Sequence, residues 1–421
     1  MKRILIKNNI WNVSYIVISI FISIFFYSKG TYYAVDSSAY IDNIISELPF
    51  YPLTIDLFEI IFRNNAFDML TTFQIGLALF VIYFFLYTMD VQYNLNYIVK
   101  LLIFAILLIP VIKSGNYILT ESIGYSLSIL FLTIFIKSII EKKFYFTLYL
   151  LLFLLLIYRP QFKLMLIFLF IYFLIQVIFY DRNFKKFIIS ISLLLIVLFI
   201  SHFTVAKYNE IYNNQNSYIK FEGTNYITTQ LYISNKDTYK IIKNEDLRNS
   251  LQIVLENIDK DKSSYKYHNN RCHFALTMKN VRKHFKNEFK TEKYLRQYGD
   301  YDNVKKIVAV QLLWENKFRY IQYVLKKAFT VTSLSIVFIF IFFCMSFYGM
   351  FKNNDVIFKI VFYISLFSLM NNLLIYAVSR FQFRYLYYSD FILLSIVVIF
   401  LYVLIEKYNN QNEEVNEKVN K

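Results

Sequence analysis

Long apolar runs separated by short charged clusters dominate the pattern of this 421-residue chain. A run of 18 or more apolar residues can cross a hydrocarbon layer of about 30 Å as a helix. The pattern predicts about ten such helices, at residues 10–28, 69–88, 98–113, 118–139, 144–158, 160–180, 187–206, 328–350, 356–377 and 387–406. The expected fold class is therefore an all-α polytopic membrane protein. The fifth segment is the shortest, and Arg159 and Pro160 separate it from the sixth.

The predicted helices fall into two modules around one large hydrophilic region. Residues 1–206 form an N-terminal module of about seven spans, with a first outer loop at 29–68. The first span follows a basic start but precedes no small-residue cleavage pattern, so we expect it to stay uncleaved. Residues 207–327 form an insert with helices expected near 245–258, 278–297 and 302–327, the last running into the eighth span. Residues 328–406 carry the last three spans, and the polar tail at 407–421 is expected to be disordered on the cytoplasmic side.

Basic residues in the short loops predict the orientation, because Lys and Arg in short loops favour the cytoplasmic side. They cluster at the amino terminus, at 137–143 and at 182–186. The first outer loop, the turn near Glu121, the Arg159–Pro160 break, the insert and residues 380–385 then share the extracytoplasmic side. This shared location requires that the fifth segment, residues 144–158, crosses the membrane. If it does not cross, the predicted orientation of every later segment is reversed.

The amino-acid composition argues against several other classes of protein. With 57% hydrophobic and 20% aromatic residues, the chain does not resemble a soluble domain. The net charge of +16 coincides with a richness in Ile, Phe, Tyr, Asn and Lys that is typical of AT-rich codon usage, so no nucleic-acid partner is expected. Seven glycines without a Gly-rich phosphate loop argue against a familiar nucleotide-binding domain. His268, Cys272 and His273 lack a recognised metal-binding spacing, and no cofactor is expected, with a divalent metal left open.

Two acidic residues stand where spans meet the predicted outer side. Asp36 follows the first span, and a partly desolvated carboxylate there is basic enough to accept a proton from a hydroxyl. Asp36 also fits the N-cap of a short helix starting at Ser37. Glu121 opens the fourth span behind Thr120, where capping and the helix dipole explain an acid without any function. Both interpretations stay open for Asp36, and Glu121 is singled out only because Asp36 is predicted on the same face.

Three arginines are predicted on the same side. Arg159, at the break between two apolar segments, is well placed for a phosphate, which a guanidinium binds through two parallel hydrogen bonds. The alternative is that it snorkels to the interface. Arg380 and Arg384 lie in a short outer segment, against the positive-inside tendency. Their retention there suggests an anionic ligand, and an error in the topology is the competing explanation.

The order of these motifs resembles the GT-C superfamily of membrane glycosyltransferases, which use polyprenyl-phosphate sugars as donors. The resemblance is carried by Asp36-Ser37-Ser38-Ala39-Tyr40, Thr120-Glu121-Ser122, Tyr158-Arg159-Pro160 and Arg384-Tyr385. It implies that Asp36 is the catalytic base, that Arg159, Arg380 and Arg384 bind the donor phosphate, and that Glu121 and Tyr40 help to bind substrate. The chain departs from several branches of the family because Ser37, rather than a second acid, follows Asp36.

The resemblance implies transfer of a sugar to an acceptor hydroxyl at the extracytoplasmic face, with inversion of the anomeric centre. The expected partners are a polyprenyl-phosphate sugar, a glycan, lipid or protein acceptor, and membrane lipids. The main alternative is an O-antigen or capsule polymerase or ligase, which concentrates essential residues in its later outer loops. A transporter or flippase is a further alternative, and it predicts polar sites near the bilayer midplane.

Overall fold

The computed structural model describes residues 2–33, 37, 41, 50–181, 183–213, 222–264, 274–298, 301–353, 355–378 and 386–419. Within these ranges the chain forms helices and one bridged residue pair, Tyr32 with Tyr117, but no strand. The chain divides into two compact units. Unit 1 comprises Met1–Tyr218, Ile339–Asn371 and Phe383–Lys421, and unit 2 comprises Ile219–Phe338 and Asn372–Gln382.

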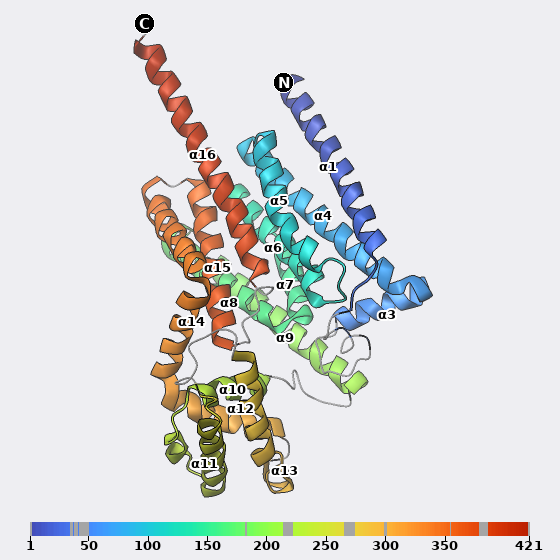
Figure 1. The fold of residues 1–421 in the computed structure, drawn as a ribbon. Coiled ribbons are helices and arrows are strands. Elements are labelled where there is room, and N and C mark those ends of the chain that lie inside the picture. The colour runs from blue at the N-terminus through green and yellow to red at the C-terminus, as the bar shows by residue number, and fades with distance from the viewer. Residues whose placement is uncertain are drawn as a thin grey trace. The chain divides into compact units, whose positions relative to one another are not determined.

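Unit 1 is a bundle of apolar helices (Figure 1). Its helices are α1 (Lys2–Lys29), α3 (Phe50–Phe62), α4 (Ala66–Tyr93), α5 (Tyr97–Ser114), α6 (Thr120–Glu141), α7 (Thr147–Tyr158), α8 (Lys163–Gln176), α9 (Phe184–Asn213), the end of α14 (Tyr301–Asn353), most of α15 (Val356–Val378), and α16 (Tyr387–Val419). The most buried of them is α6, which packs against α4, α5, α7 and α16. Helix α6 therefore lies at the centre of these four helices.

Eight of the described helices or helix pairs are long and apolar enough to cross a membrane. They coincide with eight of the ten predicted spans. The other two correspond to the shorter apolar stretches Thr147–Tyr158 and Ile336–Lys352. Large apolar side chains face outwards, for example Phe21 with 69% and Phe199 with 72% of its surface exposed. Such exposure is tolerated when the surrounding medium is lipid, and the protein is an all-α, multi-helix, membrane-embedded protein.

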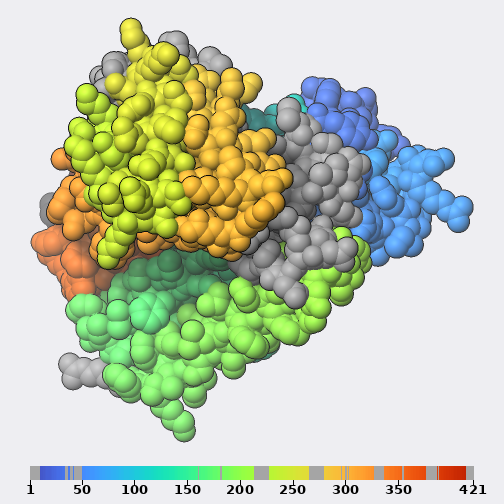
Figure 2. Space-filling view, turned by 90° about the horizontal axis from the view of Figure 1, so that it is seen from below, coloured from blue at the N-terminus to red at the C-terminus, as the bar shows by residue number. Residues whose placement is uncertain are grey.

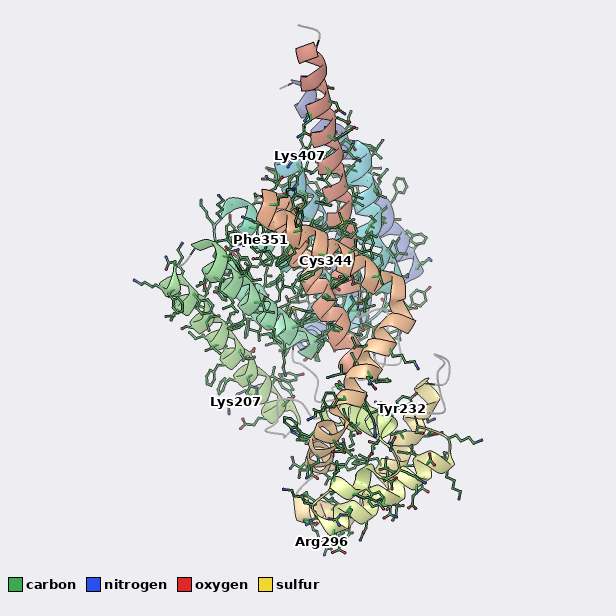
Figure 3. The ribbon with its side chains drawn as sticks, turned by 90° about the vertical axis from the view of Figure 1, so that its left-hand side faces the viewer. Lys207, Tyr232, Arg296, Cys344, Phe351 and Lys407 are labelled. Atoms are coloured by element: carbon green, nitrogen blue, oxygen red, sulfur yellow. The ribbon has the colours of Figure 1, made fainter. Side chains whose placement is uncertain are left out.

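Unit 1 has two polar ends. At the Lys407 end, Lys407 pairs with Asp355, and the Tyr402 hydroxyl donates to the Asn94 carbonyl at 3.3 Å. The N-terminal end of α1 and the C-terminal end of α16 also lie on this side, and Lys207 of α9 lies on the other (Figures 1 and 3). Between Tyr388 and Lys407, α16 is roughly 28 Å long at about 1.5 Å per residue, close to the ~30 Å of a hydrocarbon core.

The short fifth segment connects the two ends of unit 1. Just before α7, the Tyr145 hydroxyl donates to the Glu141 carboxylate at the end of α6. At the other end of α7, Arg159 pairs with Glu121 at the start of α6. Helix α7 therefore runs antiparallel along α6. The fifth predicted segment thus runs from one end of the bundle to the other, and this brings Glu121 and Arg159 to the same end.

Several elements extend beyond their predicted limits. The predicted loop 29–68 contains α3, and a turn centred on Arg63, whose φ is +50°, separates α3 from α4. Helix α9 continues to Asn213, and α16 continues to Val419. Residues 407–419, which were expected to be disordered, thus prolong the last helix. Their Glu, Gln and Lys residues are good helix formers, so a helix begun in the span can propagate through them.

Unit 2 is a small helical body with its own core. Its helices are α10 (Glu222–Ile233), α11 (Glu245–Lys260), α12 (Phe274–Phe289), α13 (Glu292–Tyr298) and the first part of α14. Figure 2 shows them packed together, coloured yellow-green to orange. Helix α11 starts at Asn244, whose side chain accepts from the Leu247 N–H at 3.0 Å. One face of α11 is apolar and buried, and consists of Leu247, Leu251, Val254, Leu255 and Ile258.

The helices predicted in the insert are present with two differences. The segment 278–297 is divided into α12 and α13, and α10 was not predicted. The prediction that the last insert helix runs into the eighth span is confirmed by α14, which is continuous over 53 residues. Helix α14 therefore contributes residues to both units.

Candidate functional site

A buried ion pair lies at the end of unit 1 opposite Lys407. The Arg159 Nη1 is 3.2 Å from the Glu121 Oε1, and the two side chains are only 13% and 3% exposed. The same Nη1 donates to the Tyr388 hydroxyl at 2.8 Å. We call Glu121, Arg159 and Tyr388 the Arg159 cluster. Its members come from the start of α6, the end of α7 and the start of α16, so only the fold brings them together.

Pro160 explains why Arg159 is available at this point. A residue before proline is driven out of the helical region, and Arg159 is extended with φ −152° and ψ +140°. Helix α7 therefore ends there, and a single helical turn, Pro160–Phe162, leads into α8. The Phe162 ring packs edge-on against the Tyr388 ring with centroids 5.1 Å apart. The break between α7 and α8 thus places both the Arg159 guanidinium and the Phe162 ring beside Tyr388.

Gly124 allows the helices to approach closely in the Arg159 cluster. A Cβ at this position would lie 3.2 Å from the Tyr388 ring and 3.3 Å from the Tyr158 ring. These distances are shorter than ordinary van der Waals contact. A side chain at position 124 would therefore push Tyr388 away from Arg159.

An aromatic wall closes the cluster beside α3. The Tyr158 ring contacts Phe50 and Tyr51 of α3 in edge-on arrangements, with centroids 5.5 and 6.0 Å apart. The Tyr158 hydroxyl is buried and has no hydrogen-bond partner within the described part of the chain. Buried hydroxyl groups are nearly always hydrogen-bonded. This group is therefore a candidate to bond a substrate atom.

The chain segment that follows α1 is tied to the segment that precedes α6. The Tyr32 N–H donates to the Asn116 carbonyl at 2.9 Å, and the Ile118 N–H donates to the Tyr32 carbonyl at 3.2 Å. The Ser37 hydroxyl, which is fully buried, donates to the Ile118 carbonyl at 2.8 Å. Ser37 is the neighbour of Asp36 in the sequence. Tyr32 and Ser37 are thus anchored to Ile118, two residues before Thr120, where α6 begins.

A second polar group lies directly beside Tyr388, where α15 meets α16. The Ser368 and Ser389 hydroxyls both donate to the Asp390 Oδ1, at 2.8 and 2.9 Å. The Asn371 amide donates to the Ser389 hydroxyl at 2.9 Å. Asp390 occupies the first turn of α16, where a negative charge is favoured by the helix dipole. We call these four residues the Asp390 network, and it fixes the start of α16.

The structure brings together two of the six predicted site residues. Glu121 and Arg159 are in direct contact, as given above. The remaining four, namely Asp36, Tyr40, Arg380 and Arg384, lie outside the described residues. His268, Cys272 and His273 lie outside them as well. No group of three or more His, Cys, Asp or Glu side chains suited to a metal ion occurs within the described ranges.

Sequence reasoning quoted Tyr158 in the Tyr158-Arg159-Pro160 motif without giving it a role, and it missed Tyr388 and the Asp390 network. For Tyr388, a chain with 38 tyrosines offers no signal that distinguishes one of them. For the network a signal existed, because Asn371 lies inside an apolar span and Asp390 lies at the start of another. Polar side chains inside a span are costly and usually face the bundle interior, so both could have been selected as candidates.

The Arg159 guanidinium is held in a fixed orientation at one end of a helix bundle. A guanidinium is planar, so the contacts that Glu121 and Tyr388 make with one nitrogen fix the orientation of the whole group. Surrounding apolar and aromatic side chains lower the local dielectric constant, which strengthens electrostatic interactions. The cluster therefore offers an oriented cation, an acid and hydroxyl groups close to the end of the spans. Comparison with known proteins identified no relative, because no family model, no curated protein and no solved structure matches this chain.

Proposed function

We propose that this protein is an integral membrane glycosyltransferase that moves a sugar from a polyprenyl-phosphate donor to an acceptor hydroxyl. The observation that supports the proposal best is the buried contact of Arg159 with Glu121 and Tyr388 at one end of the spans. If the spans cross the bilayer along their length, this end lies near the limit of the hydrocarbon core, which is also the depth of a lipid phosphate. The site therefore offers a fixed cation at the height where the leaving phosphate of such a donor would be.

Each predicted residue has a role in this reaction. The acceptor oxygen attacks the anomeric carbon of the donor sugar, and the bond from that carbon to the phosphate oxygen breaks. The phosphate leaves with the bonding electrons, and Arg159, Arg380 and Arg384 stabilise its charge. Asp36 accepts the proton of the acceptor hydroxyl. Attack from the side opposite the phosphate inverts the anomeric centre.

Glu121 acts on Arg159 rather than on the reacting atoms. Its carboxylate holds the guanidinium in place and balances its charge before the donor binds. Tyr388 and Tyr158 both lie beside Gly124, and the buried Tyr158 hydroxyl is proposed to donate to the donor phosphate or to a sugar hydroxyl. Tyr40, which was predicted from the sequence to bind substrate, contributes from the first outer loop in this proposal. The side of the membrane is proposed to be extracytoplasmic, from the basic short loops.

A transfer assay with purified protein tests the proposal. The full chain, reconstituted in nanodiscs, is incubated with a panel of radiolabelled polyprenyl-phosphate sugars and candidate acceptors. The wild type should transfer sugar from one donor. Asp36→Asn should abolish transfer because the carboxylate base is lost, and Arg159→Lys should reduce it because a lysine cannot bind phosphate through two parallel hydrogen bonds.

The matched control is Arg296→Gln, which removes an arginine on the surface of unit 2 that is 82% exposed. It should leave transfer unchanged. Near-normal turnover by Asp36→Asn would reject Asp36 as the base. Absence of transfer from every polyprenyl-phosphate donor would contradict the proposed reaction and favour a polymerase that acts on longer lipid-linked glycans, or a transporter.

A further inference from the structure

A separate pocket of about 320 Å³ lies entirely within unit 2. It is bordered by the end of α10, the residues after α10 and α11, and the middle of α14. The lining residues are Tyr232, Ile233, Ser234, Asn235, Ser264, Arg319, Gln322, Tyr323 and Lys326. Pockets that bind small molecules typically measure about 300–1,000 Å³, so this one suits a ligand the size of a single sugar unit.

One face of α14 gives the pocket a positive charge. Arg319, Gln322, Tyr323 and Lys326 are spaced by three, four and seven residues, so they lie on the same side of the helix. Asn235, with its amide carbonyl turned towards the guanidinium, accepts from Arg319 at 2.8 and 3.3 Å. Among the described residues, the lining contains the two cations Arg319 and Lys326 and no acid. The pocket therefore favours an anion, and the guanidinium is already oriented.

Hydroxyl groups and aromatic rings form the rest of the lining. The Ser264 side chain is only 6% exposed, and its hydroxyl has no hydrogen-bond partner within the described part of the chain. Ser234 accepts from the Asn316 amide at 2.8 Å, which holds its hydroxyl in place. The Tyr232 and Tyr323 rings meet edge-on with centroids 5.9 Å apart. A ligand with hydroxyls would satisfy Ser264, and a ring with apolar faces would pack on the tyrosines.

We infer that this pocket binds a sugar unit that carries an oxyanion, either a phosphate or a carboxylate. Arg319 and Lys326 bind the oxyanion, Ser264 and Asn235 bind the sugar hydroxyls, and the tyrosine pair supports the ring. The inference rests on the residues of the pocket alone and does not depend on the transfer reaction proposed above. In a membrane protein the same phosphate chemistry could come from a lipid headgroup, so the test separates the two sources.

Binding to the full chain in phosphatidylcholine nanodiscs tests the inference by titration calorimetry. The probes are glucose 6-phosphate, glucuronic acid and uncharged glucose. The two anionic sugars should bind more tightly than glucose, and their affinity should fall as NaCl is raised. Arg319→Gln should weaken both by at least about tenfold, because a charge-assisted hydrogen bond is lost. Ser264→Ala should weaken all three probes to a smaller extent.

Two further variants make the result unambiguous. Arg319→Lys keeps the charge and should lose less affinity than Arg319→Gln, which separates loss of charge from misfolding. Arg296→Gln, at the opposite end of unit 2 from Tyr232 (Figure 3), should not change binding. The inference is overturned if glucose binds as tightly as the anionic sugars, if Arg319→Gln keeps full affinity, or if no anionic sugar binds. If the anionic sugars bind in phosphatidylcholine nanodiscs but not in phosphatidylglycerol nanodiscs, the lipid headgroup occupies the pocket. That result would overturn the assignment of the pocket to a sugar.

Discussion

Replacing Glu121 with glutamine should destabilise unit 1, because the buried Arg159 would lose the counter-charge that Glu121 supplies. Glutamine has nearly the same shape and size as glutamate, so the packing around α6 should stay the same. The variant therefore removes the charge and little else. Arg159 would keep its hydrogen bond to the Tyr388 hydroxyl, which cannot neutralise a guanidinium.

The magnitude follows from the geometry of the pair. At an effective dielectric constant of about 20, two unit charges 3.2 Å apart attract each other by about 5 kcal/mol. The cost of burying both charges offsets much of this attraction, but removing one partner leaves the other charge uncompensated, which typically costs about 3–5 kcal/mol. Because the Arg159 side chain is still 13% exposed, we expect about 3 kcal/mol, at the lower end of that range.

Unfolding in mixed micelles titrated with SDS, followed by far-UV circular dichroism, measures this loss. The double variant Glu121→Gln with Arg159→Gln removes both charges and should lose less than the two single variants added together. The coupling free energy between the two positions should be about 2 kcal/mol. Glu210→Gln is the matched control in unit 1, because it breaks an ion pair with Lys207 whose partners are 45% and 52% exposed. Such exposed pairs contribute little, so this control should unfold like the wild type.

A loss of less than about 1 kcal/mol in Glu121→Gln, together with strictly additive effects in the double variant, would refute the argument. That result would mean that Glu121 and Arg159 do not depend on each other in the folded protein. It would also remove the basis for treating Arg159 as a pre-oriented cation.

Three other measurements test the structure independently. Gly124→Val should destabilise unit 1 by about 1–3 kcal/mol and reduce activity, because the new side chain meets the Tyr158 and Tyr388 rings. The control Gly76→Val should be nearly neutral in the same unfolding assay, because a Cβ at position 76 has no neighbour within 4 Å. Asn116→Ala should cost about 1–3 kcal/mol, since the Asn116 amide donates to the Phe26 and Gly30 carbonyls at 3.1 and 2.9 Å, and unchanged unfolding would contradict this role. With both native cysteines replaced by serine, Tyr33→Cys should react with an impermeant maleimide on intact cells and Lys143→Cys should not. The reverse pattern would invert the predicted orientation.

The sequence determined which segments are helical and embedded in the membrane. Runs such as 98–113 and 356–377 are too apolar for water and long enough to span, so α5 and α15 follow from composition and length. Pro160 likewise determines where α7 ends, because the constraint it imposes is local. The continuity of α14 was also predictable, since no Gly or Pro interrupts residues 302–327 before the eighth span.

The contacts of the site were decided only by the tertiary structure. Glu121, Arg159 and Tyr388 are far apart in the chain, and no local pattern states that α6, α7 and α16 pack side by side. The Asp390 network depends equally on how α15 meets α16. The extension of α16 through 407–419 shows the converse limit, because polar composition predicts disorder while helix propagation from an adjoining span opposes it. Periodicity and composition report the local preference of the chain for lipid or water, whereas a site is made by side chains that meet across helices.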